Sequence, residues 1–317
     1  MNSLTTAPLP LGPGAPVLAI DVGGTNIKYG LADASGRFIS SASVPTVIGD
    51  PDAMVDQIED VIRSQTGAGS TVRPAAVGLS IPGIVDPASG MVIASANLGW
   101  SQVPIGAMVK HRVGLPLALG HDVQMAGHAE HRLGAARDAE NALVVVIGTG
   151  IASCIIINGR IFNGGGFAGE IGHSRMEPLG SNTALRCSCG ADGCLQTLSS
   201  TGGIVHNYAT ATGHKVSGAR AVMEAAAGGD MAARAVMDKA FDALALALAQ
   251  SVSLLAPEVI VLGGGLAEAG DALLVPVAER LESVLSFHRR PRLVVAGLGM
   301  AAGRFGAALR ARELAPA

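Results

Sequence analysis

The chain has 317 residues and a formal net charge of −3, with 49% hydrophobic and 15% charged residues. This apolar composition is typical of a folded globular protein and argues against intrinsic disorder. Lys and Arg are scattered and form no blocks, which argues against a nucleic-acid-binding surface. The length allows one large domain or two smaller lobes.

The first 16 residues contain four prolines and lack both a basic segment and a long apolar core. We expect a loose tail here and no signal peptide. The most apolar later run, residues 243–257, carries Gln250 and ends at Pro257, which favours a buried helix over a membrane span. A cytoplasmic protein is expected, in a compartment where disulfides are disfavoured.

The first part of the chain predicts strands, then a helix, then a strand. Residues 17–45 alternate short β-rich runs with glycine and Asp/Ser turns, which predicts three consecutive strands. Residues 52–67 have helical spacing, and residues 75–86 return to a strand that ends in a Pro-Gly turn. The apolar residues expected on one face of the helix are Met54, Ile58, Val61 and Ile62.

A second cycle of elements begins near residue 142. Residues 142–162 predict two buried strands separated by Gly-Thr-Gly, and a long helical region covers about 217–256. Residues 258–270 predict strand, glycine turn and helix, and residues 292–312 predict a last strand and a last helix.

Both halves therefore open with a strand that runs into a glycine-rich turn, which predicts two α/β lobes with a cleft between them. Ligands commonly bind in such clefts. The expected organisation is a tail (1–16), an N-terminal lobe (17–122) and a C-terminal lobe with the cysteine-rich loop (123–300). A helix at about 301–315 is expected to pack back on the first lobe.

Three glycine turns are candidates for phosphate contacts. In "DVGGTNIK", glycines allow backbone amides to approach an anion, a threonine adds a hydroxyl, and the aspartate at a strand end could hold Mg²⁺ through water. A plain hairpin turn is the alternative. None of the three is a Walker loop or a dinucleotide fingerprint. The candidate residues are Asp21, Gly23, Gly24, Thr25 and Lys28; Gly148, Thr149 and Gly150; and Gly263, Gly264 and Gly265.

Three of the four cysteines lie close together in the stretch "RCSCGADGC". Because disulfides are disfavoured in the cytoplasm, Cys187, Cys189 and Cys194 point to a metal. The alternative is three free cysteines in a flexible loop. Cys154 falls on a predicted buried strand and is expected to be a small core residue.

The chain resembles the ROK family of bacterial sugar kinases and related repressors. The motifs "AIDVGGTNIK", "GLSIPGIVD", "ANLGW", "GHDVQMAGHAEHRLG", "GFAGEIGH" and "CSCGADGCLQ" occur in the family's order, from about Leu18 to Ala308. The resemblance implies an α/β, two-lobed actin-like ATPase (ribonuclease H-like) fold. Family repressors carry an N-terminal helix-turn-helix domain, and only 16 residues precede the first predicted strand, so we expect the kinase branch.

The resemblance implies ATP- and Mg²⁺-dependent phosphorylation of a hexose hydroxyl. It assigns phosphate contacts to the first two glycine turns and an adenine-side contact to the third. Asp122 matches the general base, and a helix N-cap is the alternative role for this residue. The sugar contacts implied are Gly83, Asn97, Glu170 and His173, and the structural Zn²⁺ ligands implied are His173, Cys187, Cys189 and Cys194.

Two positions depart from the family pattern and leave the sugar open. His121 stands where the family usually has Asn, and Gln196 stands where it usually has Glu; both look like sugar contacts. Glucose is the first candidate, with mannose, fructose or an N-acetylhexosamine as alternatives. A non-catalytic sugar-binding regulator is the rival from another class, and polyphosphate is an alternative donor. We expect a homodimer or homotetramer, with no nucleic-acid or membrane partner.

Overall fold

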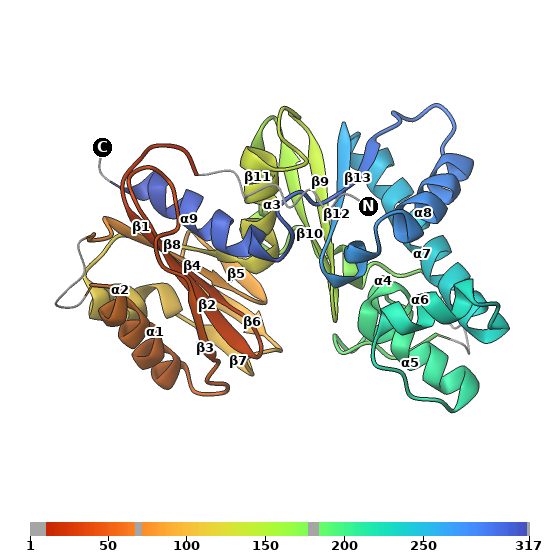
Figure 1. Cartoon of the computed structure of the whole chain (residues 1–317), viewed down its shortest axis with the longest axis horizontal. Helices are drawn as coiled ribbons and strands as arrows, with labels where there is room; N and C mark the ends of the chain where they lie inside the picture. The colour runs from red at the N-terminus through yellow and green to blue at the C-terminus, as the bar shows by residue number, and fades with distance from the viewer. Residues whose placement is uncertain (1–10, 67–71, 177–183, 316–317) are drawn as a thin grey trace. The chain divides into compact units, whose positions relative to one another are not determined.

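The computed structural model describes residues 11–66, 72–176 and 184–315 (Figure 1). The chain divides into two compact units, and both are mixed α/β structures. Unit 1 comprises Met1–Gly134, Asn163–Ala168 and Met300–Ala317, and unit 2 comprises Ala135–Phe162 and Gly169–Gly299.

Unit 1 is built on a five-stranded sheet in the order β3-β2-β1-β4-β8. β1 runs antiparallel to β2 and parallel to β4, and β4 runs parallel to β8. The three strands predicted within residues 17–45 are confirmed. The bounds are β1 (Val17–Val22), β2 (Asn26–Ala32), β3 (Ala42–Pro45), β4 (Ala76–Ile81) and β8 (Leu117–His121), with a three-stranded sheet of β5 (Ile84–Asp86), β6 (Met91–Ser95) and β7 (Trp100–Val103).

Helices cover this sheet. The apolar residues predicted on one face of the first helix are all buried. α3 packs on α9, and α9 lies so close to β4 that a Cβ added at Gly78 would meet the Ala307 carbonyl oxygen at 1.9 Å. The bounds are α1 (Pro51–Thr66), α2 (Ile105–Val113), α3 (Asp122–Leu133), α9 (Ala302–Leu314) and the short 3₁₀ turn η1 (Gly164–Gly166).

The contact between α3 and α9 places α3 in unit 1, so this unit extends to Gly134, beyond the expected boundary at Asp122. His128 of α3 faces Glu313 of α9, with Nε2 and Oε1 3.0 Å apart. α9 also holds the start of the described chain, because Arg312 donates to the carbonyl oxygen of Ala15 at 3.2 Å. The rest of the expected tail, residues 1–10, lies outside the described residues.

Unit 2 is built on a second five-stranded sheet in the order β11-β10-β9-β12-β13. β9 runs antiparallel to β10 and parallel to β12. Two strands were expected within residues 142–162, but a third follows, because Asn158 and Gly159 take positive φ (50° and 69°) and form a tight hairpin turn. The bounds are β9 (Ala142–Ile147), β10 (Ile151–Ile157), β11 (Arg160–Phe162), β12 (Val259–Gly263) and β13 (Arg292–Val295).

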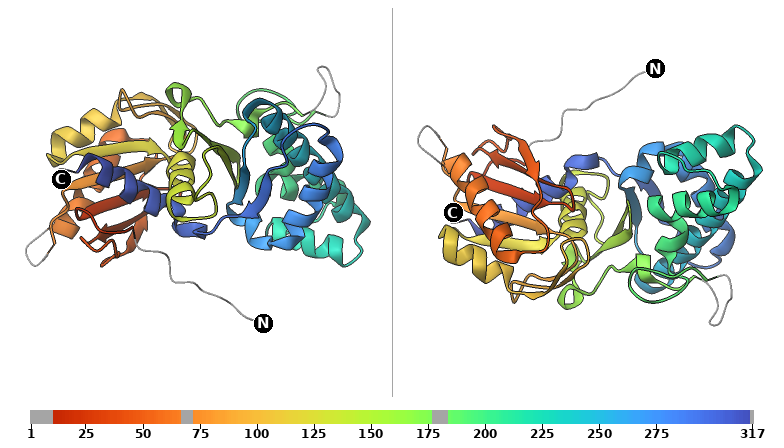
Figure 2. Two further views of the ribbon diagram at one scale, coloured as in Figure 1. Left: turned by 90° about the horizontal axis from the view of Figure 1, so that it is seen from above. Right: turned by 90° about the horizontal axis from the view of Figure 1, so that it is seen from below.

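The helices of unit 2 pack on one face of this sheet (Figures 1 and 2). The expected single helical region at 217–256 is two helices, because Gly229 takes φ 97° and Asp230 then caps a new helix by accepting from the amides of Ala232 and Ala233. The bounds are α4 (Leu195–Ser199), α5 (Thr201–Thr212), α6 (Ala219–Ala227), α7 (Met231–Leu255), α8 (Asp271–Val284), and the 3₁₀ turns η2 (Ile171–His173), η3 (Gly265–Ala269) and η4 (Gly299–Ala301).

The apolar run expected to form a buried helix lies within α7, where Leu244 and Leu248 are buried. Within the described part of the chain, no helix combines the length and apolar character needed to cross a membrane. On the other face of the sheet, Cys154 is fully buried. Cys154 is therefore a core residue, as expected, and its burial raises the pKa of its thiol to about 12.

Candidate active site and metal cluster

Asp21 lies near the carboxyl end of β1, where its register partners are Lys28 on β2 and Ser80 on β4. The Ser80 hydroxyl donates to Asp21 Oδ1 at 2.8 Å. Burial raises the pKa of the Asp21 carboxyl; the Ser80 bond opposes this rise, and the charge of Asp122 adds to it. Asp21, near the end of β1, and Asp122, directly after β8, thus both lie at the carboxyl ends of parallel strands, where α/β sheets bind ligands.

The start of α9 packs against the carboxylate of Asp21. A Cβ added at Gly303 would lie 2.7 Å from Asp21 Oδ2, so only glycine leaves room for this carboxyl group. The next residue, Arg304, places its guanidinium 4.7 Å from the centre of the Phe38 ring, and its charge favours ionisation of Asp21. Sequence reasoning missed all three residues: Ser80 lies in the motif "GLSIPGIVD" but was given no role, and Gly303 and Arg304 lie in no quoted motif.

Asp21→Asn is expected to raise the stability of the apo protein at neutral pH while lowering activity. A raised folded-state pKa means that the folded protein binds the proton more tightly than the unfolded chain, so stability falls as pH rises through that pKa. Asn carries no charge, so the variant does not lose stability in this way as the pH rises. The gain in melting temperature should therefore vanish as the pH falls toward about 4. We expect kcat/KM to drop by about tenfold or more, as for loss of one charged hydrogen-bonding group.

The matched control is Asp33→Asn, in an exposed turn of the same unit. Hydrogen bonds from the Ser35 hydroxyl and from the Arg37 backbone amide lower the pKa of Asp33, so its charge stabilises the folded state at neutral pH. This variant should lose stability and keep its activity. Melting curves of both variants and the wild type, recorded at neutral and acidic pH, measure these changes. A lower melting temperature of Asp21→Asn than of the wild type at neutral pH would contradict the prediction.

The β1–β2 turn holds the first set of candidate phosphate contacts. The Gly23 amide donates to the Asn26 carbonyl at 3.0 Å, and the Thr46 hydroxyl donates to the Gly23 carbonyl at 2.7 Å. Gly24 and Thr25 are exposed. A Cβ added at Gly24 would lie 3.8 Å from the Asn97 Cβ, so the structure brings this candidate sugar contact beside the turn.

Asp122 is the first residue of α3, directly after β8. The helix N-cap is His121, with no side-chain capping bond, so Asp122 is not the cap that the alternative interpretation required. His121 is buried, and its Nε2 lies 2.8 Å from Asp122 Oδ1, which also accepts from the Val123 amide at 2.7 Å. The Asp122 side chain keeps 36% of its exposure and is therefore accessible to a substrate. The arrangement is an oriented carboxylate that can accept a proton.

Gly83 follows β4 with φ 118°, and a Cβ there would lie 2.3 Å from the Ala94 carbonyl oxygen. Both facts require glycine at this position. This packing role accounts for the residue without a ligand, so its sugar contact stays a prediction.

Unit 2 brings the other two glycine turns together. β9 and β12 are parallel, and a Cβ added at Gly264 would meet the Ile147 carbonyl oxygen at 2.5 Å, directly before the turn at residues 148–150. The Thr201 amide and hydroxyl both donate to the Gly148 carbonyl, at 2.9 and 2.8 Å. Thr201 was missed from the sequence, because it opens a helix, α5, far along the chain.

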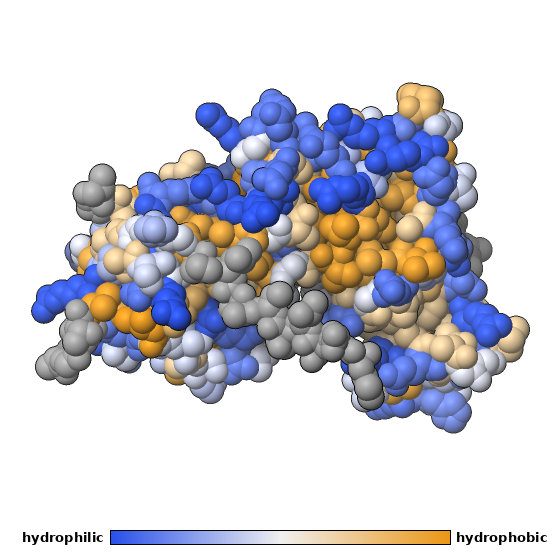
Figure 3. Space-filling model, turned by 45° about the horizontal axis from the view of Figure 1, so that its top comes forward, coloured by the Kyte–Doolittle hydropathy of each residue, from blue (hydrophilic) through white to orange (hydrophobic). Residues whose placement is uncertain are grey.

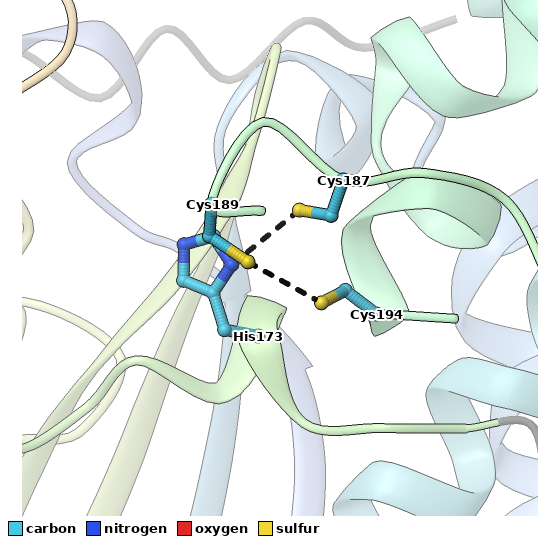
Figure 4. Close-up of side chains that lie close together, drawn as sticks. All are labelled: His173, Cys187, Cys189 and Cys194. Carbon is cyan, nitrogen blue, oxygen red and sulfur yellow. Dashed lines mark hydrogen bonds between the residues drawn. The ribbon is translucent and has the colours of Figure 1, made fainter. Parts of the chain in front are cut away.

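The three clustered cysteines and His173 meet in unit 2 (Figure 4). Their four ligand atoms all lie within 4.8 Å of one another. Cys189 Sγ and Cys194 Sγ are 3.7 Å apart, and Cys187 Sγ lies 3.6 Å from His173 Nδ1. A tetrahedral zinc ion with Zn–S bonds of about 2.3 Å places its sulfur ligands about 3.8 Å apart. The donor set and its spacing therefore fit a structural zinc ion.

Backbone geometry explains how so short a loop gathers three thiols. Gly190 and Gly193 take positive φ (92° and 74°), which permits the tight wrap. The Leu195 amide donates to the Ser174 carbonyl at 2.8 Å and so ties the loop to the segment that carries His173.

The thiols of Cys187 and Cys194 differ in their pKa. Burial opposes ionisation of Cys187, but hydrogen bonds from the backbone and thiol of Cys189 and from the amide of Gln196 outweigh it and lower its pKa to about 6. Burial, together with hydrogen bonds to Cys187 and Cys189, raises the pKa of Cys194 to about 12. Cys187 thus supplies a thiolate ligand more readily than Cys194.

His173 has a different partner on each side of its ring. Nδ1 faces Cys187, and Nε2 lies 3.8 Å from Glu170 Oε2. Both side chains keep about a third of their exposure, at 33% for His173 and 28% for Glu170. Gln196, expected to contact sugar, directs its amide nitrogen at Cys187 Sγ, 3.1 Å away.

Comparison of the sequence with known proteins identifies the family. The sequence model of the ROK family matches residues 17–313. The chain belongs to the ROK family. This confirms the resemblance identified from the motifs, and the prediction of a two-lobed actin-like ATPase fold is confirmed with it.

Individual relatives include kinases and a regulator. The glucokinase of Halalkalibacterium halodurans is 32% identical over 313 residues, covering 91% of this chain and 92% of that protein. The crystal structure of a ROK family glucokinase from Streptomyces griseus in complex with glucose and AMPPNP is 29% identical, with a TM-score of 0.77 and coverage of 94% and 99%. The DNA-binding transcriptional dual regulator NagC of Escherichia coli is 32% identical over 213 residues, covering 64% of this chain and 51% of NagC.

Proposed function

We propose that this ROK family protein is an ATP-dependent hexose kinase and that glucose is its substrate. The observation that carries the proposal is the Asp122 carboxylate, placed at the carboxyl ends of parallel strands, oriented by His121 and open to substrate. The similarity to glucokinases over nearly the whole chain supports ATP as donor and glucose as acceptor.

The chemistry assigned to Asp122 is general base catalysis. Its carboxylate accepts the proton of the attacking sugar hydroxyl, the hydroxyl oxygen forms a bond to the γ-phosphorus of ATP, and the bond from that phosphorus to the bridging oxygen breaks to release ADP. His121 holds Oδ1 and fixes the direction of the carboxylate. Asp21 would hold Mg²⁺ through water, where the ion neutralises charge on the phosphates.

The glycine turns supply the nucleotide contacts in this proposal. The exposed backbone at Gly24 and Thr25 and at Thr149 and Gly150 offers amides to phosphate oxygens. The turn at Gly263–Gly265 serves the adenine side, and its packing against the end of β9 supports one nucleotide contact shared with the turn at 148–150.

The sugar contacts come from exposed polar side chains. Asn97 beside the first turn, and Glu170 beside His173, offer acceptors and donors to vicinal hydroxyls. Gly83 and His121 remain the other proposed contacts, and Gln196, whose amide nitrogen lies 3.1 Å from Cys187 Sγ, would act on the sugar through Cys187 and His173. His173 binds metal through Nδ1, which would leave Nε2 for a sugar hydroxyl.

We assign a structural zinc ion to His173 and the three clustered cysteines. The closed set of four nitrogen and sulfur ligands supports this assignment, because structural zinc sites leave no coordination position open. The described cysteines are all free thiols, which suits a cytoplasmic protein.

The regulator is the second candidate, because NagC also matches. The match covers only about half of NagC, at 51%. A sugar sensor that does not transfer phosphate needs no oriented base, so the pairing of His121 with Asp122 favours the kinase. ATP turnover distinguishes the two.

A coupled ADP-release assay over glucose, mannose, fructose and N-acetylglucosamine tests the proposal. We expect sugar-dependent ADP release, with glucose giving the highest kcat/KM. Replacing ATP by polyphosphate in the same panel identifies the donor. Absence of sugar-dependent ADP release with every hexose would reject the kinase in favour of the regulator.

We propose that the protein forms a homo-oligomer through unit 2. Apolar side chains gather on the surface of this unit (Figure 3), which supports self-association. Sedimentation velocity of the wild type and of Leu254→Glu measures the oligomeric state. A monomeric wild type would reject the proposal. The exposed large apolar residues along α7, α8 and the segment after α8 are Met231, Leu246, Leu254, Val275, Val284 and Phe287.

A further inference from the structure

The Cys187 sulfur has a partner that is not a metal ligand. Gln196, in the first turn of α4, donates from Nε2 to Cys187 Sγ at 3.1 Å. A longer contact of 3.4 Å joins the same nitrogen to the Ser188 hydroxyl, which is exposed. The shorter contact marks the sulfur as the main acceptor.

The identity of this residue matters because the contact to Cys187 Sγ needs a hydrogen-bond donor. Gln offers two N–H donors and a carbonyl acceptor, whereas an ionised Glu only accepts. A thiolate ligand needs a donor, and a carboxylate at the same place would repel it. The family resemblance leads us to expect Glu at this position, so Gln196 changes the chemistry next to Cys187.

The other end of the amide reaches a different feature of unit 2. A Cβ added at Gly150 would lie 3.1 Å from Gln196 Oε1, so the amide oxygen lies against the turn at residues 148–150. One side chain therefore spans from the cysteine loop to a candidate phosphate turn. In this orientation the amide nitrogen points toward the sulfur and the amide oxygen toward the turn.

We propose that Gln196 is a positioning residue that holds the Cys187 thiolate by an N–H···S bond and, through Cys187, holds His173. The inference rests on the proposed zinc site. Cys187 Sγ lies 3.6 Å from His173 Nδ1, and His173 Nε2 faces Glu170. Gln196 thus acts on the sugar through the cluster, and its own nitrogen is committed to sulfur.

Gln196→Glu and Gln196→Leu test this bond. Glu keeps the shape and replaces the donor by an acceptor, and Leu removes all polarity. Partners of metal ligands are worth about 10–100-fold in metal affinity, so both variants should lose zinc to a chromophoric chelator at a correspondingly lower chelator concentration. Ser188→Ala, which removes only the longer contact, should retain zinc as the wild type does.

A spectroscopic readout separates positioning from general stability. In the Co²⁺-substituted protein, a hydrogen bond to the thiolate lowers the energy of the sulfur lone pair and raises the energy of the thiolate-to-metal charge-transfer band. Both Gln196 variants should shift this band to lower energy, and Ser188→Ala should leave it in place.

Each outcome is decisive. Variants whose zinc retention and Co²⁺ band equal those of the wild type overturn the role of Gln196 and leave the zinc site and the kinase intact. A wild type that binds neither zinc nor Co²⁺ overturns the metal site and this inference together. ADP release by the wild type tests the proposed kinase activity independently of the zinc site and of the role of Gln196.

Discussion

We expect Asp122→Asn to lower kcat by about 10²–10⁴-fold, the usual contribution of a general base, while sugar still binds. Asn preserves size and can still accept from the Val123 amide, so the start of α3 should keep its conformation. The lost function is proton acceptance alone. Steady-state kinetics with glucose, together with a sugar-binding titration, measure both parts of the expectation.

Asp271→Asn is the matched control. Asp271 is the first residue of α8, as Asp122 is of α3, so both substitutions remove a negative charge from the first turn of a helix. The control should keep normal kcat. Near-normal turnover in Asp122→Asn, or an equal loss in the control, would reduce Asp122 to a helix-terminal charge.

Cys189→Ala is expected to remove bound metal, lower thermal stability and raise the KM for sugar by about tenfold or more. Three ligands cannot close a structural zinc site, and His173 then loses the anchor that orients its ring. One hydrogen bond to a charged group is worth about 1.5–3 kcal/mol, which sets the size of the KM change. Cys189 is exposed, so the substitution leaves no core cavity. Metal analysis should find about one zinc per wild-type chain and almost none in the variant.

Cys154→Ala gives the comparison for this second prediction. Cys154 is fully buried on β10 and lies outside the cluster, so its truncation should cost stability through packing alone and leave zinc content and KM unchanged. A purified, active wild type without metal would contradict the zinc assignment.

Features that depend on local sequence were predictable. The strands within residues 17–45 and the buried face of α1 follow from residue periodicity, and the structure has both. The spacing of the cysteines pointed to a metal cluster because short loops with glycine can gather thiols. Position 173 came only from the family resemblance, since nothing local links it to the cysteines.

Features created by tertiary packing were not predictable. Gly303 contacts Asp21 because α9 packs on β1 and β4, and no local sequence pattern predicts that contact. The orientation of Gln196 toward Cys187 likewise depends on how α4 follows the cysteine loop. The missed break before α7 was different: the pair Gly228–Gly229 followed by Asp230 is a local signal, outweighed by the apolar run on either side.

The most direct test of the central claim is the phosphorus NMR spectrum of the wild type incubated with ATP, Mg²⁺ and glucose. We expect a sugar phosphate resonance to grow as the γ-phosphate resonance of ATP declines, in a one-to-one ratio with ADP and without inorganic phosphate. Asp122→Asn in the same experiment should leave the spectrum almost unchanged. ADP accompanied by inorganic phosphate, or no reaction in the presence of bound glucose, would contradict the assignment as a hexose kinase.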